Sequence, residues 1–184
     1  MSIERSLIEH CSPTLASLKV GSLFSFLSPA GEDLQAQIDA LNLLLREKGL
    51  NLRMVKSLGD RTLCYLYRQS HLNAVLSNPD HAAFLEKQGY ESINTHCVLE
   101  TLCQRLEANP DFPHEIGLFL GYPLGDVIGF IENRGKNCLC CGCWKAYTDA
   151  CAAQRLFAKF SKCTEVYKRM YQSGRSLSQL TVAA

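Results

Sequence analysis

The residues best suited to chemistry are clustered: four cysteines lie within six positions, at Cys138, Cys140, Cys141 and Cys143. Thiolates bind soft and borderline metal ions and exchange disulfides, and an apolar core has no need of so many adjacent sulfur atoms. The Cys-rich segment 138–143 therefore predicts a functional site. The only tryptophan of the chain, Trp144, and the adjacent Lys145 follow directly and are candidate cofactor-binding residues.

One metal ion cannot collect all four thiolates from an extended segment. Alternate side chains of a strand point to opposite faces, so the first two cysteines and the last two would lie on different faces. The two separate Cys-x-x-Cys pairs typical of structural zinc sites are absent. A shared ion then needs a remote ligand, for which Cys163, inside the apolar stripe of the last helix, ranks before Cys11. A vicinal disulfide or a thiol–disulfide switch is the alternative to metal binding.

A second pattern suits a nucleophile. His10 and Cys11 precede Ser12-Pro13, which predicts a helix N-terminus, where backbone N–H groups and the helix dipole favour a thiolate. His10 or the distant His114 can provide the base, and Glu115 a base or a hard metal ligand. The plainer alternatives are a helix start at Cys11 and a strand-edge ion pair at His114-Glu115.

Turn residues and hydrophobic periodicity define the elements that must position these side chains. Strands are expected at residues 20–27, 52–58, 62–67 and 114–120, the last in the centre of the sheet because it is apolar on both faces. Helices are expected from Ser28-Pro29 to Gly49, at 70–77, at 79–88, at 93–108 before Asn109-Pro110, at 124–131 and at 149–172. This order predicts an α/β fold, with α+β as the variant, in which helices flank a mixed sheet of about five strands.

Composition narrows the class of protein. With 184 residues, 47% of them hydrophobic, the chain suits a single domain over residues 1–184. Its charged first ten residues lack the apolar region of a signal peptide, and no apolar run reaches the roughly 20 residues of a membrane span. We therefore expect a cytoplasmic protein with mostly reduced thiols and no membrane partner.

The net charge of +1 hides an asymmetry. Residues 134–184 carry nine Lys and Arg against two acids, whereas residues 1–133 carry ten against sixteen. Such a basic field is expected to lower the pKa of nearby thiols and to attract an acidic protein partner. Aromatic residues are only weakly interleaved with the basic ones, so no nucleic-acid partner is expected.

Several motifs resemble one bacterial family, DUF3793, a domain of unknown function. They are His10 to Leu15, Pro113 to Asn133, Cys140 to Lys145, Lys162-Cys163-Thr164 and Leu180-Thr181-Val182, so that the resemblance covers nearly the whole chain. It implies that Cys11, Cys140, Cys141 and Cys163, with Gly142 and Trp144, are typical positions, and that Cys138 and Cys143 vary. It implies no activity.

Three functions are therefore expected from the sequence, in this order. The first is binding of a thiophilic metal, iron or zinc ahead of copper, by the Cys-rich segment. The second is a thiol-based redox or nucleophilic enzyme that uses Cys11. The third is a non-catalytic interaction module whose basic C-terminal part binds an acidic protein.

Overall fold

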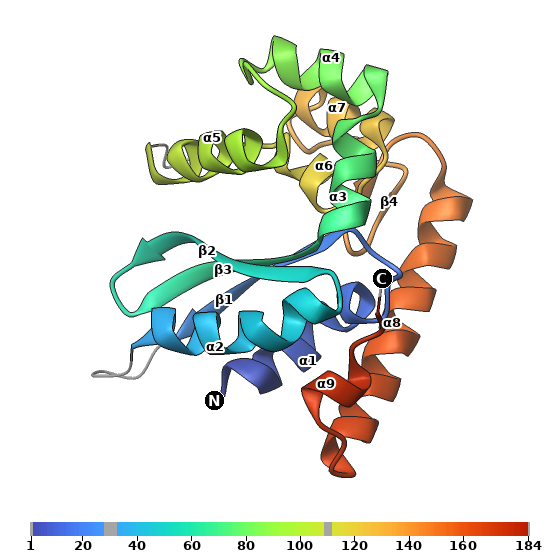
Figure 1. The fold of residues 1–184 in the computed structure, drawn as a ribbon. Helices are drawn as coiled ribbons and strands as arrows, with labels where there is room; N and C mark the ends of the chain where they lie inside the picture. The colour runs from blue at the N-terminus through green and yellow to red at the C-terminus, as the bar shows by residue number, and fades with distance from the viewer. Residues whose placement is uncertain (1, 28–32, 109–111, 184) are drawn as a thin grey trace.

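Figure 1 shows the computed structural model, which describes residues 2–27, 33–108 and 112–183. The expected helix start at Ser28-Pro29 and the expected break at Asn109-Pro110 lie outside the described residues. The described part is a mixed α+β single domain with two small sheets, and this corrects the α/β expectation.

The main sheet has three antiparallel strands in the order β1-β3-β2: β1 (Gly21–Leu27), β2 (Leu50–Leu58) and β3 (Arg61–Arg68). These strands confirm the first three predicted ones. The single sheet of about five strands is wrong, because the fourth predicted strand is helical. The remaining pair, β4 (Cys140–Cys141) and β5 (Lys145–Ala146), forms a separate two-stranded sheet.

Helices cover both faces of the main sheet (Figure 1). On one face lie α1 (Ile3–Leu15) and α2 (Leu34–Glu47). On the other face lie α3 (Gln69–Leu76), α4 (Pro79–Lys87), α5 (Thr95–Ala108), α6 (Ile116–Phe119) and α7 (Leu124–Glu132). The long helix α8 (Ala150–Gln172), predicted at 149–172, packs beside α1 and leads to α9 (Leu177–Leu180).

The alternation of strand β3 explains the two cores. Cys64 and Leu66 face the core under α1 and α2, whereas Tyr65 and Tyr67 face the core under α3 to α7. All four side chains are buried, so β3 is the central strand for both layers. None of the described helices is both long and apolar enough to span a membrane.

Helix α1 does not begin at Ser12-Pro13, as expected, but runs through these residues to Leu15. Pro13 removes one helical donor, and the Ser12 hydroxyl donates a hydrogen bond to the Ile8 carbonyl in the same turn. The helix stays continuous because its apolar face remains buried on both sides of the proline, from Leu7 to Leu15. Burial thus outweighs the local proline signal.

The predicted strand at 114–120 is also wrong. Its backbone forms the short helix α6, with Gly117 N donating to His114 O and Leu118 N to Glu115 O. Ile116, Leu118 and Phe119 are all buried, so every face of this turn is apolar. A short, fully buried segment has the same hydrophobic pattern as a strand or as a helix, which is why periodicity misassigned it.

Candidate functional site

The Cys-rich segment folds as a tight antiparallel hairpin, β4–β5, against the start of α8. At its tip Gly142 N donates a hydrogen bond to the Trp144 carbonyl at 3.0 Å. Gly142 lies so close to the Phe157 ring of α8 that a Cβ atom would overlap it. The glycine therefore fixes the distance between the hairpin and α8.

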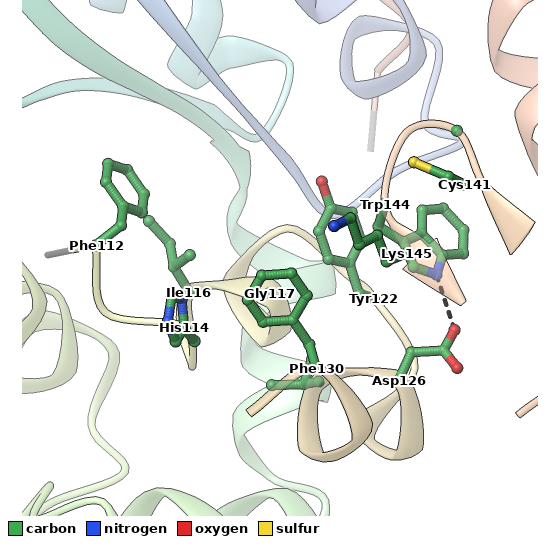
Figure 2. Close-up of a pocket in the computed structure, with 12 residues that line it drawn as sticks. Phe112, His114, Ile116, Gly117, Tyr122, Asp126, Phe130, Cys141, Trp144 and Lys145 are labelled. Atoms are coloured by element: carbon green, nitrogen blue, oxygen red, sulfur yellow. Dashed lines mark hydrogen bonds between the residues drawn. The ribbon is translucent and has the colours of Figure 1, made fainter. Parts of the chain in front are cut away.

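Asp126, a buried carboxylate on α7, holds the hairpin from its other side. Its Oδ2 accepts a hydrogen bond from Trp144 Nε1 at 2.8 Å (Figure 2). Its Oδ1 accepts from the N–H groups of Tyr147 and Thr148 at 2.8 and 2.9 Å, and from the Thr148 hydroxyl at 2.7 Å. Burial raises the pKa of Asp126, but these hydrogen bonds outweigh it and hold the pKa below its usual value. The ionised carboxylate thus positions Trp144.

Two glycines bring α7 into contact with the segment after the hairpin. A Cβ on Gly125 would meet the Thr148 methyl group, and a Cβ on Gly129 would meet Tyr147, both at 2.6 Å. Asp126 lies between these glycines, so the close approach carries its carboxylate to the backbone that it binds. The Gly-Asp-Val-Ile-Gly sequence of α7 is therefore what joins this helix to the hairpin.

A cavity of about 450 Å³ lies between α6, α7 and the hairpin. Apolar and aromatic side chains make up most of its wall: Phe112, Ile116, Tyr122, Val127, Phe130 and Trp144. Tyr122 stacks on Trp144 with ring centroids 4.9 Å apart. Figure 2 shows Phe112 and His114 on one side of the cavity and Cys141 and Trp144 on the other.

Three of the predicted site residues, His114, Cys141 and Lys145, join Asp126 as the polar groups of this wall. The His114 ring meets the Phe130 ring edge-on at 4.9 Å. Lys145 Nζ donates to the Gly135 carbonyl at 2.6 Å and lies 5.9 Å from the centroid of Phe130. The structure thus brings Trp144, Lys145, Cys141 and His114, which are up to 31 positions apart in the sequence, to one cavity.

Glu115 is not part of this wall. It is buried, and its Oε1 accepts hydrogen bonds from Arg105 Nη1 at 2.9 Å and from the Tyr90 hydroxyl at 3.1 Å. Glu115 thus forms an ion pair, as the plainer alternative expected, but with Arg105 and at the start of helix α6 rather than at a strand edge.

Thiols gather where the hairpin meets α8. Cys140 Sγ lies 3.8 Å from the carbonyl oxygen of Ala150, the first residue of the helix. Burial raises the pKa of Cys140, and the charges of Cys138, Asp126, Cys141 and Cys151 raise it further. The expected lowering of thiol pKa by the basic C-terminal part is therefore not found at Cys140.

Cys163 lies far from this cluster. Cys140 Sγ lies beside Ala150, and Cys163 is 13 residues further along α8, which is about 20 Å at ~1.5 Å per residue. Two sulfur atoms that share an ion at bond lengths near ~2.3 Å lie less than about 5 Å apart. The structure therefore does not bring Cys163 to Cys140 and Cys141. Over residues 2–27, 33–108 and 112–183, no three His, Cys, Asp or Glu side chains are placed to hold one metal ion.

Cys11 lies in the middle of α1, fully buried against the sheet. Burial raises the pKa of its thiol well above the usual value, the opposite of what an activated nucleophile needs. The neighbouring His10 ring stacks on Phe24 with centroids 6.3 Å apart. Neither condition that motivated a nucleophilic Cys11, a helix N-terminus or an accessible thiolate, is present.

Sequence reasoning missed Asp126, Tyr122 and Phe130 as site residues, and it missed that Cys151 lies near the hairpin. An acid between two glycines of a mostly apolar helix is a signal that pointed to Asp126. Cys151 is exposed, as its helical position predicts, and its place in the first turn of α8 brings it near Cys140. The aromatic wall carries no such signal, because it depends on the packing of α6 and α7.

Comparisons with known proteins identify a family. A search of curated proteins and a search of solved structures each give no match. The family model described as "Protein of unknown function (DUF3793)" matches residues 7–181 of the 184. This range includes the hairpin, Asp126 and the whole of the cavity wall. The resemblance of the sequence motifs is thereby confirmed, and the chain belongs to the DUF3793 family.

Proposed function

We propose that this protein binds a small, largely apolar molecule in the cavity beside Trp144. The observation that supports this proposal most is the wall itself: aromatic and aliphatic side chains surround about 450 Å³, with few polar groups among them. Small-molecule sites commonly occupy about 300–1,000 Å³ and have this kind of lining. The hairpin with the Cys-rich segment then serves as one wall of a binding site.

The charged groups of the wall favour a ligand with an anionic group. Asp126 already accepts four hydrogen bonds from the protein, so we do not assign its carboxylate to ligand binding. Lys145 uses one ammonium hydrogen on the Gly135 carbonyl and keeps two donors. An apolar body against Tyr122 and Trp144, with a carboxylate or sulfonate near Lys145, matches both features.

The only tryptophan of the chain is a built-in reporter for this proposal. Titration with anilinonaphthalene sulfonate, an apolar anion, should change Trp144 emission in a saturable way. Lys145→Met should lower the affinity for this probe by about 3- to 10-fold, roughly 1 kcal/mol. The affinity for the neutral N-phenylnaphthylamine should not change. Lys136→Met, outside the wall, is the matched control. A change in Trp144 emission that does not saturate would contradict the proposal. An equal loss of affinity for the anionic probe in both lysine variants would also contradict it.

Binding of a thiophilic metal is a second candidate, supported by the electrostatic influence of three other thiols, those of Cys138, Cys141 and Cys151, on Cys140. The Tyr147 hydroxyl is buried and has no hydrogen-bond partner among the described residues. Two of these thiols, Cys138 and Cys141, contribute to raising its pKa, and the hydroxyl can donate to a thiolate. Iron or zinc would draw the four sulfurs together by a shift of the hairpin.

Elemental analysis of protein purified without oxygen tests this second candidate. We expect about one iron or zinc per chain, lost in Cys140→Ser and in Cys151→Ser but retained in Cys163→Ser, which serves as the matched control. If the wild-type protein is purified without metal and takes up neither iron nor zinc, metal binding is excluded.

A further inference from the structure

A second cavity, of about 340 Å³, lies between α1, α8 and the tip of the hairpin. Its wall is mixed, with apolar Pro13, Phe157 and Phe160 beside polar and charged groups. The hairpin separates it from the Trp144 cavity, because Cys141, Gly142 and Trp144 line the first cavity and Cys143 lines the second. The two spaces therefore offer different chemistry.

Lys19 is the cation of this second cavity without an acidic partner. No carboxylate among the described residues contributes to its electrostatic environment, and its Nζ lies 5.4 Å from the centroid of the Tyr122 ring. Burial lowers the pKa of Lys19, while the thiols of Cys143 and Cys11 oppose this effect. An ammonium group held partly buried, with no carboxylate among its electrostatic partners, favours an anionic occupant.

Cys143 is the accessible thiol next to this ammonium. Its side chain is exposed at the hairpin tip, and its carbonyl accepts a hydrogen bond from the Tyr122 hydroxyl at 3.2 Å. Tyr122 thus contacts both residues, its ring facing Lys19 and its hydroxyl bound to Cys143. The buried Cys11 thiol lacks this access.

The wall contains one further lysine and one acid. Lys168 faces the cavity, and the acid Glu165 is 3.8 Å from Lys162. An occupant with carboxylates therefore meets two ammonium groups, from Lys19 and Lys168.

We propose that this cavity binds a low-molecular-weight disulfide that carries carboxylates, and that Cys143 forms a mixed disulfide with it. The Cys143 thiol loses its proton to water, and the thiolate attacks one sulfur of the small disulfide. A Cys143–sulfur bond forms while the original sulfur–sulfur bond breaks, and the other half leaves as a thiolate that takes up a proton. Cys143 is oxidised and the small disulfide is reduced, so electrons and atoms balance.

Glutathione disulfide is the probe for the test, and Cys97 is the internal reference, because Cys97 is exposed on α5 away from both cavities. The reduced full-length protein is incubated with the probe, and peptide mass spectrometry follows the adduct at each cysteine. Cys143 should react about tenfold faster than Cys97, and Lys19→Met should reduce its rate to that of Cys97. Lys159→Met, on the same helix but outside the wall, should leave it unchanged.

A neutral disulfide distinguishes the effect of the charged cavity on Cys143 from the intrinsic reactivity of its thiol. Lys168→Met, an exposed substitution that leaves the fold intact, should slow the reaction of Cys143 with glutathione disulfide and not with hydroxyethyl disulfide. Equal rates at Cys143 and Cys97, faster labelling of Cys141, or equal effects of Lys168→Met on both disulfides would overturn the proposal. Trp144 emission is not measured in this test. A negative result here would therefore leave the ligand proposed for the first cavity unaffected.

Discussion

Asp126 is the single residue on which the geometry of the Trp144 cavity depends most. It joins α7 to the indole of Trp144 and to two backbone N–H groups after the hairpin. A hydrogen bond to a charged group contributes roughly 1.5–3 kcal/mol, and a buried donor left without an acceptor costs about as much. The carboxylate thus determines where Trp144 lies.

Asp126→Asn tests this role. An amide has one oxygen in place of two and brings its own N–H₂ group toward donors, so we expect the free energy of unfolding to fall by about 2–4 kcal/mol. The indole of Trp144 should also become more accessible to acrylamide quenching. Asp60→Asn, at an exposed position, is the matched control, and equal unfolding curves for the two variants would contradict the assignment.

The same carboxylate predicts a dependence on pH. Its folded pKa lies below the reference value of 3.8, so the stability it contributes is complete above that value and is lost as the pH falls through the lower, folded pKa. Acid titration of Trp144 emission should show this transition. Asp126→Asn should remove it, and a wild-type transition that persists unchanged in this variant would refute the assignment to Asp126.

At the scale of elements, helix α7 and the hairpin form one unit because Gly129 lets them touch. Two effects oppose each other at this position. Alanine in a helix interior is favoured over glycine by roughly 1 kcal/mol, but a Cβ here overlaps Tyr147, and overpacking costs about 1–3 kcal/mol. The contact term is the larger, so glycine is the stable choice.

Gly129→Ala should therefore lower the melting temperature, although it raises helix propensity. In a Tyr147→Gly background, where the overlapping atoms are absent, the same substitution should raise stability by about 1 kcal/mol. Thermal unfolding of the four proteins measures both effects. A stabilising Gly129→Ala in the wild-type background would show that the contact is not tight.

How far the elements can be predicted follows from their length and surroundings. The long helix α8 and the hairpin of β2 and β3 have a clear period and clear turn residues, and they occur where the sequence places them. The segment at 114–120 and the break at Pro13 were misassigned, because burial on all sides hides the period and packing outweighs a local proline signal. The β4–β5 hairpin was considered only as an extended segment, since two-residue strands have no detectable period.

At the scale of the whole molecule, Arg68 joins the ends of distant segments. It is fully buried and donates to the carbonyls of Thr14 and Leu15 at the end of α1 and of Val182 near the C-terminus, each at 2.7 Å. One guanidinium thus connects β3, α1 and the segment after α9. These partners are carbonyl groups, which is why the sequence pattern gave no sign of the connection.

Arg68→Met keeps much of the side-chain volume and removes the three hydrogen bonds that the buried guanidinium donates to carbonyl groups. We expect a loss of at least about 3 kcal/mol in the free energy of unfolding, measured by urea denaturation. Arg61→Met, at the exposed start of the same strand, should change it by less than about 0.5 kcal/mol. Similar losses in both variants would exclude a special role for Arg68.

The candidate site as a whole shows where sequence reasoning stops. The cysteine cluster pointed to a segment that contributes to the cavity wall, and Trp144 and Lys145 lie in the same wall. The pairing of Cys140 and Cys141 with Cys163 was expected from the inward stripe of α8, but a stripe fixes only the direction of a side chain and not its height along the helix. The cavity itself depends on α6, which the sequence pattern assigned to a strand.

The most direct test of the central claim, a ligand site beside Trp144, is the indole N–H signal of this single tryptophan in a ¹H–¹⁵N spectrum. Because that N–H donates to Asp126 at the cavity wall, it should give one signal that shifts and saturates as anilinonaphthalene sulfonate is added. Lys145→Met should require about 3- to 10-fold more probe to reach the same shift. An indole signal that stays in place while the probe binds elsewhere on the protein would contradict the account.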